Sequence, residues 1–185
     1  MQTEDNKPAL HKPGFRAVRR IVTGTNADNR SFIQSDGATP NVLCEPGRPV
    51  AQVLWATGAS RAAGDEPAPE GHKFPFHSAN GSLLRVVDFP PDSFYDQDEL
   101  LKFLDDSGVR DKNQPRHFWF HKTESLDYAI VLEGEIYAMM DEDEVLMQAG
   151  DILVQRATNH SWSNRSDQPC RMAFVLLDLV PGEPL

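Results

Sequence analysis

Hydrophobic and polar residues alternate in short runs along most of this chain, and turn residues such as Gly, Pro or Asp-Gly separate many of the runs. Alternation over about four to eight residues predicts β-strands with one buried face. Short strands with turns at regular spacing are typical of a sandwich or barrel, so the pattern predicts an all-β fold. The predicted strands cover residues 16–24, 30–37, 49–58, 83–91, 117–123, 127–134, 135–140, 144–148, 151–157, 160–164 and 170–180.

Two segments break this alternation. Apolar residues recur at helical spacing between 100 and 104, with Ser93 or Asp96 as the capping residue and Gly108 as the stop, which predicts one short amphipathic helix. Residues 57–81 contain Gly, Pro, Ala and charged residues without periodicity and are predicted to be a long surface loop. This loop and the helix are candidates for a lid over the mouth of a barrel.

The length of the chain fits one domain. Its 185 residues can build a sizeable core without a metal or disulfides. Residues 1–15 are polar and contain Pro8 and Pro13, so we expect a flexible N-terminal arm, followed by a single domain over residues 16–185.

Charge and composition narrow the set of partners. The 18 Lys and Arg against 28 Asp and Glu give a net charge of −10, whereas nucleic-acid binding needs a basic face, so we expect no nucleic-acid partner. Apolar runs stay below the roughly 20 residues that cross a bilayer, so we expect no membrane partner. The N-terminus lacks an apolar stretch, and Cys44 and Cys170 form no CxxC pair. We therefore expect a cytoplasmic protein with free thiols and a small-molecule ligand.

The candidate chemistry lies in the predicted strand 117–123. Residues two apart share a face of a strand, so Trp119, His121 and Thr123 would line one wall together with His117. A wall that mixes aromatic and polar groups suits a binding pocket. Asp127 follows six residues after His121, and a second histidine lies on a later predicted strand.

That second histidine is His160, with Trp162 on its face. Two histidines and one carboxylate form the facial triad that binds Fe(II) and can also hold Zn, Mn or Ni. The sequence therefore offers a candidate divalent metal site on His121, Asp127 and His160.

At these positions the chain resembles the cupin family, across residues 117–179. The first cupin motif reads Gly, five residues, His-x-His, three or four residues, Glu, six residues, Gly. Here His121 takes the first His position, Thr123 stands at the second, Asp127 replaces the Glu, and Gly134 closes the motif.

The second cupin motif opens with Gly and carries a His followed by an Asn. In this chain Gly150, His160 and Asn164 match these positions, although the PxG of the motif is absent. The resemblance implies a double-stranded β-helix barrel, similar to a jelly roll, with an N-terminal strand extension and the one short helix.

The resemblance also implies a small oxygenated organic substrate inside the barrel. A metal on His121, Asp127 and His160, with open positions, would serve a lyase, decarboxylase or isomerase. An Fe(II) dioxygenase on the same ligands and a ligand-binding cupin without turnover are the alternatives. A metal-free alternative pairs a histidine with Asp127 as the base and takes Tyr128 or Tyr137 as the acid.

Further residues complete this interpretation. Trp119, Thr123 and Trp162 would line the cavity, while Gln155 and Arg156 would lie beside its mouth, where Arg156 could pair with a substrate carboxylate. His117 is expected to be structural. Cupin strand extensions commonly pair across a dimer, and exposed strand edges need cover, so we expect a homodimer.

Overall fold

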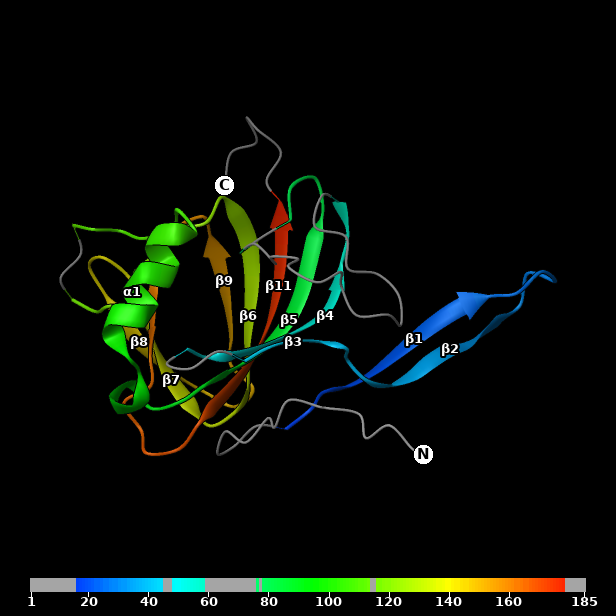
Figure 1. The fold of residues 1–185 in the computed structure, drawn as a ribbon, viewed down its shortest axis with the longest axis horizontal. Helices are drawn as coiled ribbons and strands as arrows, with labels where there is room; N and C mark the ends of the chain where they lie inside the picture. Colours follow the sequence, from blue (N-terminus) through cyan, green and yellow to red (C-terminus); the bar gives the residue numbers. More distant parts are fainter. Residues whose placement is uncertain (1–15, 45–47, 59–75, 77, 114–115, 179–185) are drawn as a thin grey trace, which may run out of the picture.

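The computed structural model of the protein describes residues 16–44, 48–58, 76, 78–113 and 116–178. Within these ranges the chain forms two antiparallel sheets that share one core, a projecting hairpin and one α-helix (Figure 1). The strands are β1 (Arg19–Thr25), β2 (Ser31–Ala38), β3 (Asn41–Leu43), β4 (Val50–Ala56), β5 (Ser82–Phe89), β6 (Ser125–Glu133), β7 (Glu135–Met139), β8 (Glu144–Gln148), β9 (Ile152–Arg156), β10 (Ser161–Ser163) and β11 (Cys170–Asp178).

The larger sheet has six strands in the order β3-β4-β5-β11-β6-β9, and the smaller has the order β10-β7-β8. All neighbouring strands are antiparallel. The last strand, β11, lies between β5 and β6, so segments far apart in sequence meet at the centre of the larger sheet. This arrangement confirms the predicted all-β, jelly-roll-like barrel.

Alternation along β6 and β7 separates an inner from an outer face. On β6, Asp127 and Ala129 are 4% and 0% exposed, whereas Tyr128 between them is 37% exposed. The inner faces of both sheets meet in one apolar core that also includes the helix. Its members include Val53, Leu83, Val87, Ala129, Val131, Met172, Phe174 and Leu176 from the larger sheet, Ile136, Ala138, Met147 and Trp162 from the smaller sheet, and Leu100 and Leu104 from the helix.

The predicted helix is formed as α1 (Gln97–Asp106), and its ends have the expected chemistry. The Asp96 side chain accepts a hydrogen bond from the Glu99 amide at 3.2 Å, which caps the first turn. Gly108, with a φ of +69°, follows the last turn. Leu100 and Leu104 are both 0% exposed, so the helix is held by the burial of one face.

The predicted strand at residues 117–123 is wrong. Residues 118 and 119 form a turn, and the segment makes β-bridges only at His121, which pairs with Arg110 and His160. The His117 ring accounts for the departure, because its nitrogens lie 2.6 Å from Ser161 Oγ and 3.2 Å from an Asp92 carboxylate oxygen. These contacts hold the start of the segment against β10 and replace regular strand pairing.

Asp92 lies in a short 3-10 helix, η2 (Asp92–Phe94), which it fixes to β10. Its carboxylate accepts hydrogen bonds from Ser163 Oγ at 2.7 Å and from the Asn164 amide at 3.0 Å. Together with His117, these bonds clamp the segment that leads into α1 onto the smaller sheet. The structural role expected for His117 is supported by this network.

The N-terminal strand extension is the hairpin of β1 and β2, which projects away from the barrel (Figure 1). Ile21, Phe32 and Ile33 on this hairpin are 52%, 47% and 57% exposed. The short strand β3 was not predicted. The predicted arm over residues 1–15 and most of the predicted loop at 57–81 lie outside the described residues. In the part of the chain that the structure describes, no helix is long and apolar enough to cross a membrane.

Candidate functional site

Two histidines lie side by side in the barrel. The backbone amide of His121 donates to the carbonyl of His160 at 2.9 Å, and the amide of His160 donates back at 3.0 Å. This pair of bonds places the two imidazole ring centroids 4.3 Å apart. Each histidine is only 3% exposed, so the sequence prediction that His121 and His160 converge agrees with their placement here.

The backbone also fixes the tautomer of both rings. His121 Nδ1 lies 2.7 Å from the Trp119 carbonyl, and His160 Nδ1 lies 3.0 Å from the Thr158 carbonyl. A carbonyl oxygen can only accept, so Nδ1 carries the hydrogen in each ring. Each Nε2 therefore presents an unprotonated lone pair.

Both imidazoles are neutral at pH 7. Burial lowers the pKa of His160 from 6.5 to about 4. Burial also holds the pKa of His121 well below 6.5, and the neighbouring His160 and Arg85 act in the same direction. The pair can thus accept hydrogen bonds or protons without carrying charge in the free protein.

Aromatic rings enclose the histidine pair. Trp119 meets His121 edge to face at 5.7 Å between centroids, and Trp162 meets His160 in the same way at 5.8 Å. Phe76 lies 5.2 Å from the His121 ring and 5.6 Å from Phe103 of α1. Trp119 and Trp162, which were expected to line a cavity, are 7% and 3% exposed and belong to the apolar core beside the pair.

Arg85 adds a positive charge that sequence reasoning missed. It lies on β5 opposite Phe174 of β11, and its guanidinium carbon is 5.4 Å from the Phe76 ring centroid and 5.6 Å from that of Phe174. Burial lowers the pKa of Arg85 to about 10, while the charge of Asp127 raises it, so the side chain stays cationic at pH 7. The sequence did carry a signal, because Arg85 interrupts an inward-facing series of Leu83, Val87 and Phe89.

Asp127 lies on the inner face of β6, opposite Gln155 of β9. Gln155 is 2% exposed and its Nε2 donates to the Thr158 carbonyl at 2.9 Å. Gln155 Oε1 is buried and accepts no hydrogen bond from the described part of the chain. Thr123, which stands at a cupin ligand position, is 4% exposed and its hydroxyl accepts from Ser125 Oγ at 3.0 Å.

The residues described do not fit the predicted three-ligand metal site. Among them, no group of three His, Cys, Asp or Glu side chains lies close enough to hold one ion. His121 and His160 are together, but Asp127 does not complete the set. The charge of Arg85 also acts on both imidazoles, and a cation beside two ligands opposes the binding of a dication.

The two candidate acid residues do not lie at the histidine pair, which corrects that expectation. Tyr128 is on the outer face of β6 and 37% exposed. Tyr137 alternates with the buried Ile136 and Ala138, and its ring packs under Arg165, whose guanidinium carbon is 4.0 Å from the ring centroid. Strand alternation thus turns both hydroxyls away from the inner face.

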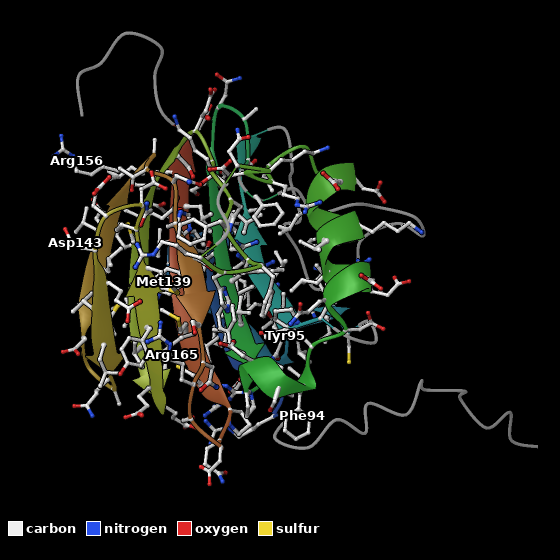
Figure 2. All side chains as sticks on the ribbon, turned by 90° about the vertical axis from the view of Figure 1, so that its left-hand side faces the viewer. Phe94, Tyr95, Met139, Asp143, Arg156 and Arg165 are labelled. Atoms are coloured by element: carbon white, nitrogen blue, oxygen red, sulfur yellow. The ribbon has the colours of Figure 1, made fainter. Side chains whose placement is uncertain are left out.

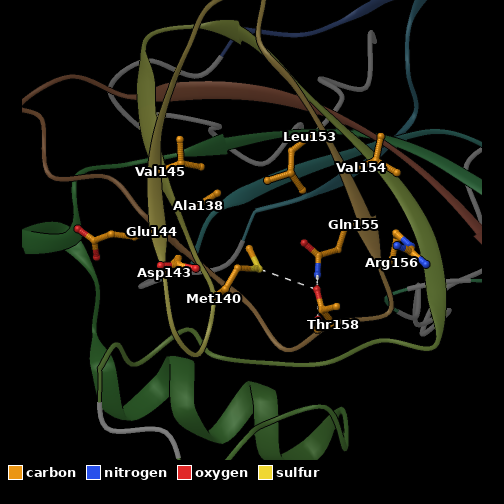
Figure 3. A pocket seen from close by; sticks show the side chains of 10 residues that line it. All are labelled: Ala138, Met140, Asp143, Glu144, Val145, Leu153, Val154, Gln155, Arg156 and Thr158. Carbon is orange, nitrogen blue, oxygen red and sulfur yellow. Dashed lines mark hydrogen bonds between the residues drawn. The ribbon is translucent and has the colours of Figure 1, made fainter. Parts of the chain in front are cut away.

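Arg156 is exposed and lies at the edge of the larger sheet (Figure 2). It lines a pocket of about 320 Å³ between β8 and β9, with Ala138, Met140, Asp143, Glu144, Val145, Leu153, Val154, Gln155 and Thr158 (Figure 3). Gln155 and Thr158 are hydrogen bonded within this pocket, and Thr158 Oγ1 lies 3.9 Å from Met140 Sδ. Gln155 and Arg156, which were expected beside the mouth of the barrel, both line this pocket, whereas the histidines are not part of its lining.

Both cysteines are free, as predicted, but they differ in burial. Cys170 is buried, and Cys44 is half-buried. Burial raises the pKa of the Cys170 thiol to about 12, which leaves it protonated and unreactive at pH 7.

The barrel and its motif positions define a member of the cupin class, and comparison with known proteins agrees. The cupin domain family matches residues 111–177. Over 178 residues, covering 91% of this chain and 80% of the relative, the chain is 30% identical to the cupin-domain-containing oxidoreductase virC from Hypocrea virens. The chain belongs to the cupin family.

Two further similarities are more partial. The chain is 49% identical over 105 residues to the Phomopsin biosynthesis cluster protein C' of Diaporthe leptostromiformis, which covers 56% of this chain and 43% of that protein. Among solved structures, it is similar to an uncharacterized conserved protein with a double-stranded β-helix domain from Klebsiella pneumoniae. That similarity has a TM-score of 0.43 and 16% identity, and covers 74% of this chain and 82% of the other.

Proposed function

We propose that this protein is a cupin enzyme that binds a small oxygenated organic molecule beside His121 and His160 and removes a proton from it. One observation carries the proposal: both Nδ1–H groups are bound to backbone carbonyls, so two Nε2 lone pairs remain to accept a proton. A hydroxyl or an acidic C–H of the ligand would be the donor. Proton removal next to a carbonyl is the first step of many isomerase and lyase reactions.

The surroundings of the pair favour such a step. Both histidines are 3% exposed and flanked by Trp119 and Trp162, so bulk water is kept from the lone pairs. A proton acceptor in a dry site with a fixed orientation needs little reorganisation during the reaction. The spacing of the two rings is fixed by backbone bonds, so both can contact one small ligand.

An oxidation is the second candidate, and the observation in its favour is the relative named as a cupin-domain-containing oxidoreductase, which matches 91% of this chain. Oxidation of an alcohol releases the hydroxyl proton and two electrons with the second hydrogen. His121 or His160 would take the hydroxyl proton, and an external acceptor would take the C–H hydrogen together with both electrons. Dioxygen as that acceptor would become hydrogen peroxide, which carries both hydrogens. This second candidate uses the same histidines as proton acceptors and additionally requires an electron acceptor.

The test is deuterium exchange. Small hydroxy and oxo compounds, both neutral and anionic, are incubated with the protein in D2O, and loss of the C–H signal next to the carbonyl is followed by NMR, with oxygen uptake recorded in parallel. We expect exchange that is lost in His121→Gln and His160→Gln and kept in His117→Gln, a histidine outside the pair. Ligand binding without exchange or oxygen uptake would contradict the proposal and favour a non-catalytic binding cupin.

A further inference from the structure

We propose that Arg85 anchors the ligand and that the ligand is a small carboxylate with a hydroxyl group next to it. This rests on the proposed function, because it assumes that the ligand sits beside the two imidazoles. Arg85 brings a positive charge that acts on both imidazoles. The site would accordingly select an anion.

The first argument is the hydrogen bonding of Arg85. Its Nε is buried and has no hydrogen-bond partner among the residues that the structure describes. Buried donors are nearly always satisfied, and an unsatisfied cationic donor is costly, so such a group calls for a ligand. The donor belongs to a side chain on the inner face of β5, in line with the buried Leu83 and Val87.

Arg171 shows how this fold satisfies a structural arginine. On the other face of the same sheet, Arg171 Nε and Nη2 lie 2.6 and 2.8 Å from the two carboxylate oxygens of Asp88, and Nη2 also donates to the Arg16 carbonyl at 2.6 Å. Arg85 makes no such fork with the residues that the structure describes, and the charge of Asp127 raises its pKa. Arg171 is thus held by a carboxylate of the protein, as expected for a structural residue, whereas Arg85 keeps its donors for a ligand, as expected for a binding residue.

The second argument is orientation. Phe76 and Phe174 contact the guanidinium through their ring faces, which holds a cation without using its N–H donors. The donors stay available for a planar carboxylate, which matches the guanidinium fork. Phe174 in turn meets Trp162 at 5.5 Å, so the aromatic wall runs from Arg85 to His160.

The third argument is the complementary pattern of donors and acceptors. Arg85 offers only donors, whereas Nε2 of His121 and of His160 offers only an acceptor. A ligand that satisfies both needs an anionic oxygen and, close by, an O–H group.

The experiment compares acids with their uncharged amides. Binding of salicylate and lactate is measured by calorimetry and by tryptophan fluorescence, beside salicylamide and lactamide, which keep the shape and the hydroxyl but lose the charge. Whichever of salicylate and lactate binds more tightly is expected to bind roughly 10- to 100-fold more tightly than its own amide. Arg85→Gln should abolish this preference, and Arg85→Lys should keep part of it.

Two further arginines serve as controls. Arg19→Gln alters an exposed arginine on the projecting hairpin and should leave the preference unchanged. Arg156→Gln tests the pocket on the sheet edge, and loss of the preference in this variant instead of Arg85→Gln would overturn the proposal. Equal binding of acid and amide, or no binding of any carboxylate at millimolar concentration, would also overturn it.

Folding and catalysis are separated from anion binding in the same series. Circular dichroism and thermal melting test whether Arg85→Gln is folded. If it is not, Arg85→Lys, which keeps the positive charge, takes its place in the binding comparison. Acid-selective binding through Arg85 without deuterium exchange would leave this inference standing and contradict the proposed function. Exchange on neutral compounds only would support the function and overturn the inference.

Discussion

The buried His160 should make the stability of this protein depend on pH in a predictable way. Its pKa is lowered from 6.5 to about 4, mainly by burial. The unfolded chain therefore binds a proton more readily than the folded protein. Its contribution to stability is fully present above about pH 6.5, and it falls as the pH drops towards the folded pKa.

The magnitude follows from linkage. A depression from 6.5 to about 4 corresponds to roughly 3 kcal/mol between the two limits. Between about pH 7.5 and about pH 5 the part attributable to His160 is about 2 kcal/mol, because most of the unfolded chains have by then taken up the proton. His121 adds a loss of the same sign.

The assay is urea unfolding of the wild type and His160→Gln at both pH values, with a chelator present to remove adventitious metal. Glutamine keeps a polar side chain but cannot titrate. We expect the wild type to lose about 2 kcal/mol more than the variant on acidification. An equal pH dependence in the two proteins would refute the assignment of His160 as a buried neutral imidazole.

Three further predictions concern the pair on the outer face, the metal and the oligomer. Asp88→Ala should lower the free energy of unfolding by roughly 3 to 5 kcal/mol, because it strands the buried Arg171, and replacing both residues by Leu should cost less. Elemental analysis after addition of Fe, Mn, Ni or Zn should find well under one ion per chain, and a full complement lost in Asp127→Asn would contradict this. A homodimer remains a prediction. Sedimentation should show a dimer that Ile152→Asp disrupts, because Ile152 is 63% exposed on the edge strand β9, while a wild-type monomer would refute it.

Much of the fold was predictable because its determinants are local. The alternation along β6 and β7 reflects burial of one face of each strand, and α1 follows from the Asp96 cap and the apolar face at Leu100 and Leu104. The segment 117–123 also alternates, but its structure depends on the bonds of His117 to Asp92 and Ser161, which are distant in sequence. A pattern of residue types carries no information about such partners.

The candidate site was predictable in part for the same reason. His121 and His160 occupy motif positions, and the barrel brings such positions together. Arg85 was missed because an arginine on a strand is ordinarily placed in solvent, although its alternation with the buried Leu83 and Val87 marks the inner face. The predicted role of Asp127 as a third ligand assumed a spacing that strand geometry did not supply.

Hydrogen exchange at the β-bridge between His121 and His160 would report how often the site opens. Each residue's amide hydrogen is bonded to the other's carbonyl, and neither residue belongs to a regular strand. Solvent deuterium can replace these two hydrogens only when the bridge breaks, which is also the event that separates the imidazoles. The exchange rates of these two amides would thus measure the opening of the site. A ligand that contacts both rings should slow the exchange of the two amides by the same factor.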